Sequence, residues 1–323
     1  MTSNNTWRHA ACAILAAWLA ATGATARAAP ANETPALKPA RHDPYAANAG
    51  MLDADRAGKR VVAVGERGVI LLSDDDGATS RQATAVPADL TLTAVAFADE
   101  RNGWAVGHGG VILHTADAGD HWELQRSDSA TDQPLLTVHF RDARHGWAGG
   151  LWSLLLATSD GGKTWTNVTL APPEGSKKAD LNLLKIFASG RQLYIAAERG
   201  MVLHSADDGA TWQYLATGSK ASLWSGAASG AGTLVVGGLG GRMLRSTDGG
   251  ARWAAVEAGS ASVTQLRADG QGLWAGTLDG RLLRSTDDGR SWSAVAVGAT
   301  PLTAIVARAG GGYLRYGKSG LIK

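Results

Sequence analysis

Apolar and polar residues alternate along most of the chain in short runs, and glycine or aspartate separates one run from the next. In the segment 92–114, such runs cover 92–97, 103–106 and 111–114, with a His-Gly-Gly step before the last one. A period of two is typical of a half-buried strand, and a Gly-rich break is typical of a tight turn. The succession returns about every 40 residues, which predicts repeated antiparallel sheets of four short strands.

One eight-residue motif, Ser/Thr-x-Asp-x-Gly-x-x-Trp, marks these repeats. Five complete copies end at Trp122, Trp165, Trp212, Trp253 and Trp292, and a sixth copy ends at Ser80 instead. The six end positions are 42, 43, 47, 41 and 39 residues apart. Such near-equal spacing indicates a propeller in which each repeat is one blade. The aspartates expected to be structural are Asp75, Asp117, Asp160, Asp207, Asp248 and Asp287.

The residue types of this motif suit a rigid corner between two strands. The Asp side chain can accept hydrogen bonds from its own turn, Gly adopts a backbone conformation closed to other residues, and Trp covers the apolar side. The motif resembles the Asp-box, or BNR, repeat of sialidases, sortilin-type receptors and other propellers. This resemblance implies a structural role between the third and fourth strands of a blade, away from any active site.

The residues after Trp292 decide the number of blades. Three strand signals remain, at 302–306, 313–316 and 321–322, so six motif-bearing repeats and this fragment make seven blades. The predicted fold class is all-β: a seven-bladed β-propeller of four-stranded antiparallel blades, with a six-bladed ring as the alternative. Because the fragment lacks a fourth strand, we expect residues 29–50 to donate the outer strand of the last blade and to close the ring by pairing the N- and C-terminal segments.

The first 28 residues are typical of an export signal. Two basic residues precede an apolar stretch at 10–21, which is too short to span a bilayer and is followed by small residues. We therefore expect a signal peptide at 1–28, cleaved near Ala28/Ala29. The mature protein would be exported and periplasmic, with the propeller at 51–323.

Composition narrows the functional classes. Gly supplies 42 of 323 residues, about twice its usual share, which suits many tight turns and disfavours a helical bundle. Lys and Arg exceed Asp and Glu by 31 − 29 = 2, and both surplus cations precede residue 29, so the exported chain would be neutral. Neutrality argues against nucleic-acid binding. Cleavage would also remove Cys12, the only cysteine, and with it any thiol chemistry.

The first three repeats resemble photosystem II stability/assembly factor-like (Ycf-type) proteins. The likeness is carried by residues 60–73, 102–115 and 145–149, which read RVVAVGERGVILLS, NGWAVGHGGVILHT and HGWAG. The resemblance implies a seven-bladed propeller that acts as a non-enzymatic interaction or assembly factor for a membrane protein complex. In bacteria without photosystems, it implies an association with efflux-type transporters. We expect a monomer without catalytic residues, cofactor or metal ion.

A partner would need a surface, and the turns between the second and third strands of the blades offer one, opposite the Asp-box corners. Arg and Trp often dominate the binding energy of protein interfaces, and Trp152 replaces the Gly of other repeats. The alternative is that these are ordinary solvated turn residues, with Glu66 and Glu198 balancing two arginines. The predicted partner-binding residues are Arg67, His108, Trp152, Arg199 and Lys318.

Other chemical signals are weaker. Residues 312–319 match the phosphate-loop pattern, but only four residues follow, too few for the helix that supplies such an anion site. The eight histidines lack metal-ligand spacing, and the acidic run 74–76 lacks the ligand series of a calcium loop.

Two alternative functions stay open. One is a sialidase-like glycoside hydrolase, although the chain has no Arg-Ile-Pro segment, and the other is a carbohydrate-binding propeller.

Overall fold

The structure is a computed structural model that describes residues 37–128 and 130–322, so the expected signal peptide at 1–28 lies outside the described residues. Apart from short 3-10 turns, the described elements are strands, and no described helix is long and apolar enough to cross a membrane.

Consecutive strands pair antiparallel into seven sheets. Blades 1 to 3 consist of β1 (Met51–Ala57), β2 (Arg60–Gly65), β3 (Ile70–Ser73) and β4 (Arg81–Gln82); β5 (Leu92–Phe97), β6 (Gly103–Gly107), β7 (Ile112–Thr115) and β8 (Glu123–Arg126); and β9 (Leu135–Phe140), β10 (Gly146–Gly150), β11 (Leu155–Thr158) and β12 (Thr166–Asn167).

The remaining four blades follow the same order along the chain. Blades 4 and 5 consist of β13 (Leu183–Ser189), β14 (Gln192–Ala197), β15 (Met201–Ser205) and β16 (Gln213–Ala216), then β17 (Leu223–Ala228), β18 (Leu234–Gly238), β19 (Met243–Ser246) and β20 (Ala254–Val256). Blades 6 and 7 consist of β21 (Val263–Asp269), β22 (Gly272–Thr277), β23 (Leu282–Ser285) and β24 (Ser293–Ala296), then β25 (Ala304–Ala307), β26 (Tyr313–Gly317) and β27 (Gly320–Ile322).

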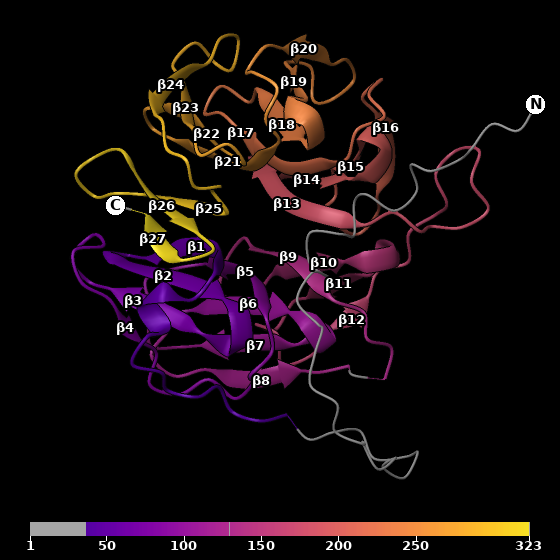
Figure 1. Cartoon of the computed structure of the whole chain (residues 1–323). Coiled ribbons are helices and arrows are strands. Elements are labelled where there is room, and N and C mark those ends of the chain that lie inside the picture. The colour runs from indigo at the N-terminus through magenta and orange to yellow at the C-terminus, as the bar shows by residue number, and fades with distance from the viewer. Residues whose placement is uncertain (1–36, 129, 323) are drawn as a thin grey trace, which may run out of the picture. The chain divides into compact units, whose positions relative to one another are not determined.

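The first strands of the blades form the inner wall of a closed ring. Each inner strand contacts the inner strand of the next blade, in the order β1, β5, β9, β13, β17, β21 and β25, and β25 contacts β1 again. In Figure 1 these strands surround the middle of the molecule, and the later strands of each blade lie farther out. The predicted seven-bladed β-propeller is confirmed.

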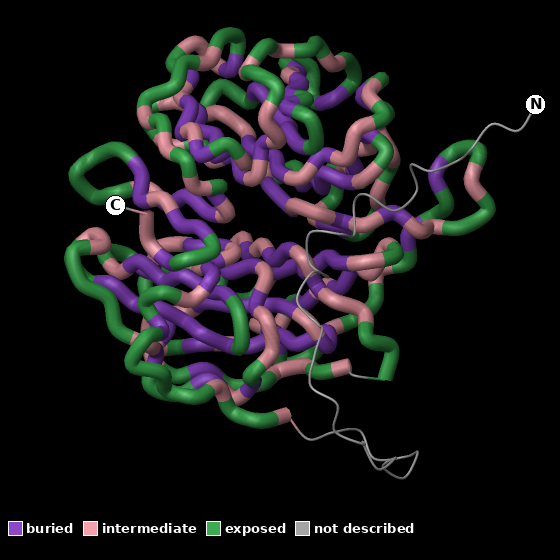
Figure 2. Tube along the Cα trace, in the orientation of Figure 1, coloured by how far each residue is buried: buried purple, intermediate pink, exposed green. Residues whose placement is uncertain are grey.

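The hydrophobic core lies between blades. Each of seven buried clusters joins two neighbouring sheets; for example, Val62 and Leu72 of blade 1 pack with Val95 and Leu113 of blade 2. A single blade therefore cannot bury its apolar faces alone, and the ring must close before the core is complete. Figure 2 shows buried residues concentrated along the strands and exposed residues in the loops.

Polar side chains link the inner strands, which do not form a continuous sheet with one another. In four places, the side chain at the third position of an inner strand accepts a hydrogen bond from a backbone N–H of the next inner strand. These hydrogen bonds run from Val95 to Asp53 (3.3 Å), from Ile186 to Thr137 (2.9 Å), from Leu266 to Ser225 (2.8 Å) and from Ile305 to Gln265 (2.5 Å). They satisfy backbone donors that would otherwise be buried without a partner at the strand edge.

The expected outer strand of the last blade requires a correction. Blade 7 has three strands, and residues 37–50 form no strand; their regular element is the 3-10 turn η1 (Ala46–Asn48), which contacts β27. The segment before η1 bonds instead to the linker that follows blade 1, through Ala40 N–H to Val86 O (2.9 Å) and Asp89 N–H to Lys38 O (2.8 Å). It also bonds to Gln82 in β4, the two-residue outer strand of blade 1. Residues 29–36 lie outside the described residues.

Candidate functional site

Five of the turns between second and third strands share an unusual backbone. They are the 3-10 turns η2 (Glu66–Gly68), η3 (His108–Gly110), η4 (Leu151–Ser153), η5 (Glu198–Gly200) and η6 (Leu239–Gly241). Their central residues adopt left-handed φ angles of 52° to 67°, which favour glycine. In blades 2 and 5 the central residue is glycine, but Arg67, Trp152 and Arg199 occupy it elsewhere. Arg67, Trp152 and Arg199 are all exposed, so these turns display large side chains to solvent.

Four of the five predicted partner-binding residues lie in the turns η2 to η5, and Lys318 lies in the corresponding turn of blade 7, between β26 and β27. We call this side of the ring the turn face. Each comes from a different blade, and the five blades, 7 and 1 to 4, are consecutive around the ring. Arg67, Arg199 and Lys318 are exposed, Trp152 is 58% exposed, and His108 is half-buried. Within 37–128 and 130–322, no hydrogen bond or ion pair joins two of the five, so they form a distributed surface and not one compact site.

Trp152 is held by the linker between blades 3 and 4. Its backbone N–H donates to Asn182 Oδ1 (3.0 Å), and Asn182 Nδ2 donates to Glu198 Oε1 (3.0 Å) in the next turn. The following residue, Ser153, donates its N–H to Leu181 O (2.7 Å) and also has a positive φ of 58°. The exposed indole therefore projects from a fixed backbone, which lowers the entropy lost when a partner binds.

Exposed cations surround this part of the turn face. Arg199 pairs with Asp180 at 3.4 Å, but four neighbouring cations form no ion pair within the described part of the chain. Leu239, in the turn of blade 5, adds an exposed apolar side chain. Blades 3 to 5 thus present an apolar and positively charged sector. The four exposed cations are Lys177, Lys178, Lys220 and Arg242.

The opposite side of the ring, which we call the corner face, carries the motif loops. In blade 2, Asp117 Oδ1 accepts hydrogen bonds from Asp120 N–H and His121 N–H (both 3.0 Å), and Thr115 Oγ1 accepts one from Gly119 N–H (3.0 Å). The other five motif aspartates likewise accept the N–H of the residue four positions on. In blade 4, such hydrogen bonds lower the pKa of Asp207 to about 2, and the largest contribution comes from the Thr211 hydroxyl. The motif carboxylates are thus occupied within their own loops.

A charged cluster inside the central channel was not foreseen from the sequence. Asp53 of β1 accepts Arg267 Nη2 at 2.9 Å and Gln265 Nε2 at 2.5 Å, both from blade 6, and lies 3.6 Å from Lys185 Nζ of blade 4. With Val95 N–H of blade 2, the carboxylate ties four blades together; we call it the Asp53 hub. The available signal was at the third position of the inner strands, where Asp53, Lys185 and Gln265 stand in β1, β13 and β21, whereas β5, β9 and β17 have Ala, Thr and Ser.

Burial and charge act in opposite directions within the hub. Burial alone would raise the pKa of Asp53, but Lys185 and Arg267, followed by two backbone N–H groups, outweigh it and keep that pKa below its usual range. Burial lowers the pKa of Lys185, and the attraction of Asp53 offsets only part of this effect. Burial raises the pKa of Asp55, two residues along β1, although Arg267 opposes it. The hub therefore holds one ionised carboxylate between two cations, with a less firmly ionised carboxyl beside it.

The channel histidine predicts a pH dependence of stability. Burial, then Lys185 and Arg141, lowers the pKa of His139 to about 4, whereas an unfolded histidine titrates near 6.5. The unfolded chain therefore binds this proton first, so stability falls as the pH drops below about 6.5, by about 2 kcal/mol from this group at pH 5. We expect His139→Gln to lose less stability than the wild type between pH 7 and pH 5 in urea titrations. Equal losses would contradict the buried, neutral histidine.

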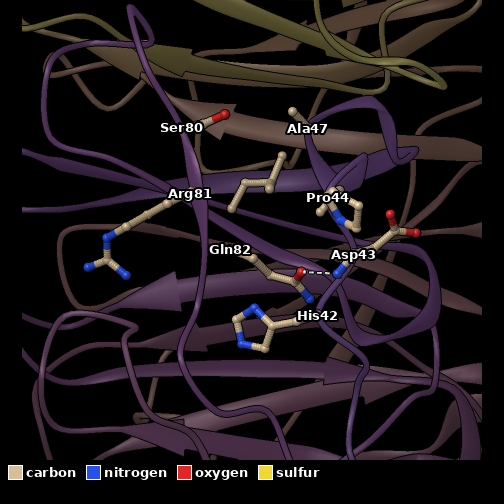
Figure 3. A pocket seen from close by; sticks show the side chains of 9 residues that line it. His42, Asp43, Pro44, Ala47, Ser80, Arg81 and Gln82 are labelled. Carbon is tan, nitrogen blue, oxygen red and sulfur yellow. Dashed lines mark hydrogen bonds between the residues drawn. The ribbon is translucent and has the colours of Figure 1, made fainter.

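The hollow in Figure 3 lies where the N-terminal segment crosses blade 1. It has a volume of about 380 Å³, and its labelled side chains come from this segment and from residues 80–82. Gln82 accepts Asp43 N–H (3.1 Å) through Oε1 and donates to Arg41 O (2.8 Å) through Nε2. Both ends of the amide therefore hold the crossing segment, which favours a structural role. No group of His, Cys, Asp and Glu in the described ranges could hold a metal ion.

Comparisons with known proteins agree with this architecture. Residues 121–227 match the model of a family described as Photosynthesis system II assembly factor YCF48. This chain is a propeller similar to YCF48. A solved structure titled "YCF48 bound to D1 peptide" shares 19% identity with a TM-score of 0.69, covering 90% of this chain and 97% of that chain. YCF48 from Cyanidioschyzon merolae shares 18% identity with a TM-score of 0.65, covering 89% and 97%.

The fold is not confined to YCF48 structures. The extracellular domain of the one component system BT4673 from B. thetaiotaomicron shares 15% identity with a TM-score of 0.65, covering 85% of this chain and 38% of that chain. No curated protein matches the sequence. The stretch that matches the YCF48 family includes Trp152 and Arg199, and it ends in β17. At these identities the structural likeness concerns the fold alone.

Proposed function

We propose that this chain is a non-enzymatic assembly factor whose turn face holds a segment of a membrane protein. The observation that carries the proposal is Trp152, a large apolar side chain that is 58% exposed on a fixed, left-handed turn. A Trp in this backbone conformation is unfavourable for folding, so its presence is best explained by binding. The surrounding cations favour a segment that carries acidic residues.

The comparisons support a protein partner. One similar structure is, by its title, YCF48 bound to a D1 peptide, and the family match covers the blades that carry Trp152 and Arg199. A rigid ring suits this task, because its turns are fixed before the partner arrives and little conformational entropy is lost. For a bacterium without a photosystem, a transporter is the partner we propose.

Replacing Trp152 by glycine should separate binding from stability. Glycine adopts the left-handed φ of 52° without strain, so Trp152→Gly should fold with an equal or higher melting temperature. We expect it to lose at least about tenfold in affinity for the partner, since a central Trp often contributes 2 kcal/mol or more. The measurement is capture from detergent-solubilised membranes, followed by titration of the identified protein.

Ala118→Gly is the matched control, because Ala118 also has a left-handed φ, of 61°, but lies in a corner loop of blade 2. It relieves the same kind of strain and leaves the turn face unchanged, so it should bind like the wild type. If Trp152→Gly captures the same proteins with unchanged affinity, the turn face near blade 3 does not hold the partner.

We also propose that the protein is exported to the periplasm, on the basis of residues 1–28. Expression of the full chain in a Gram-negative host should yield a periplasmic product whose N-terminus is Ala29. Intact-mass analysis of the periplasmic fraction would establish this. Recovery of the uncleaved chain in the cytoplasm alone would exclude the export signal.

A further inference from the structure

The seven junctions between neighbouring blades differ in strength. The buried cluster between blades 6 and 7 holds five side chains, whereas each of the other six clusters holds eight or more. The cluster is small because blade 7 has three strands among the described residues and lacks an Asp-box corner. Fewer apolar side chains are therefore removed from water at this junction than at the others. The five buried side chains are those of Trp274, Leu282, Leu302, Ile305 and Tyr313.

Few polar contacts cross the junction of blades 6 and 7. A hydrogen bond runs from Ile305 N–H to Gln265 Oε1 (2.5 Å), and the ring of Tyr313 lies 4.7 Å from that of Trp274. No ion pair crosses this junction within the described ranges, although ion pairs join blades 1 and 2, blades 3 and 4, and blades 5 and 6. The junction therefore depends mainly on its small apolar cluster.

Blade 7 is bound more firmly to blade 1, its neighbour on the other side. Their buried cluster holds eleven side chains, and η1 contacts β27. In Figure 1 the yellow strands of blade 7 lie beside β1. Hydrogen bonds cross this junction from Arg56 Nη1 to Ala307 O (2.6 Å), from Ala309 N–H to Asp76 Oδ2 (2.9 Å) and from Thr303 Oγ1 to Met51 O (2.5 Å). Blade 7 therefore loses more contacts by leaving blade 1 than by leaving blade 6.

We propose that the ring opens at the junction of blades 6 and 7, with blade 7 remaining on blade 1. Residues 297–303 link blades 6 and 7, carry no charge and include Gly298, so they suit a hinge. Proteins open locally where few buried apolar contacts hold the structure. The ladders of hydrogen bonds run within single blades and would stay intact, while the rings of Trp274 and Tyr313 would face water. The opening is a property of the ring and does not depend on the partner proposed above.

Four buried amides report on such an opening. The N–H groups of Val95, Ile186, Leu266 and Ile305 each donate to the third-position side chain of the preceding inner strand, across four different junctions. Hydrogen exchange of these amides, followed by NMR on the purified protein and corrected for intrinsic rates, compares the junctions within one molecule. We expect Ile305 N–H to exchange at least about tenfold faster than the other three.

Two tyrosines of β26 provide a matched pair of variants. Tyr313 packs into the cluster that faces blade 6, and Tyr316 packs into the cluster that faces blade 1. Tyr313→Leu should speed the exchange of Ile305 by a further factor of about ten and leave Val95 unchanged. Tyr316→Leu makes the same replacement at the firmer junction and should change the exchange of Ile305 by less than about threefold. Equal exchange of all four amides in the wild type, or equal acceleration of Ile305 by both variants, would overturn the proposal.

Discussion

The Asp53→Asn variant should lose about 3 to 5 kcal/mol of stability. Asparagine keeps the shape of the side chain but removes the negative charge that pairs with Lys185 and Arg267, two cations inside the channel. Breaking a buried ion pair on one side leaves the other side charged and desolvated, which costs far more than the pair itself contributes. The contacts of Asp53 also join four blades, so losing its charge should weaken the interactions that keep the ring closed. Equilibrium denaturation in urea, or the melting temperature if unfolding is irreversible, would measure it.

Two companion variants make this expectation specific. Asp74→Asn removes a carboxylate that pairs with Arg60 at 2.6 Å on the surface, so it should cost at most about 1 kcal/mol. Combining Asp53→Asn with Lys185→Met should recover part of the loss, because one unpaired buried cation is removed. If Asp53→Asn and Asp74→Asn cost the same, the hub does not hold the blades together.

The Gly200→Ala variant should lose about 3 kcal/mol or more, which corresponds to a fall of roughly 6 °C or more in melting temperature. Gly200 is the last residue of η5 and has a φ of 69°, where alanine is strained. A Cβ atom there would also overlap the backbone carbonyl oxygen of Ser219, which cannot rotate away. Gly200 O also accepts a hydrogen bond from Thr217 N–H (3.1 Å), so a shift of the Gly200 backbone would disturb the linker to blade 5.

Gly240 provides the control that separates strain from overlap. Its φ is 67°, nearly the same, but a Cβ atom at Gly240 would meet no atom within 4 Å. Gly240→Ala should therefore cost only about 1 kcal/mol, the ordinary penalty of a left-handed non-glycine residue. Similar losses in the two variants would show that strain alone governs these turns, and that close packing against the linkers contributes little.

Local patterns were sufficient to predict the blades. The period-two runs at 92–97 and 111–114 became β5 and β7, and the glycines between them became the turn η3. The motif predicted hydrogen bonds within each corner because each bond spans at most five residues, as from Gly119 to Thr115 and from His121 to Asp117. Both kinds of signal depend on neighbours in the sequence, and this is why they could be interpreted without a structure.

Contacts between distant residues were beyond such patterns. In the Asp53 hub, Asp53 contacts Gln265 and Arg267, which lie 212 and 214 positions later in the chain. No local sequence pattern specifies that these residues meet. The outer strand expected from residues 29–50 is absent from 37–50, which form no strand. These residues bond instead to the linker after blade 1 and to Gln82 of β4, more than 30 positions away in the chain, and no local pattern specifies such contacts.

The most direct test of the account is a photo-cross-linking residue placed at position 152 in living cells. If the turn face holds a membrane protein, irradiation should produce one dominant adduct with an integral membrane protein. The same residue at Leu124, exposed on the outer strand of blade 2, should produce none. An absence of adducts from position 152, or identical adducts from both positions, would contradict binding through Trp152.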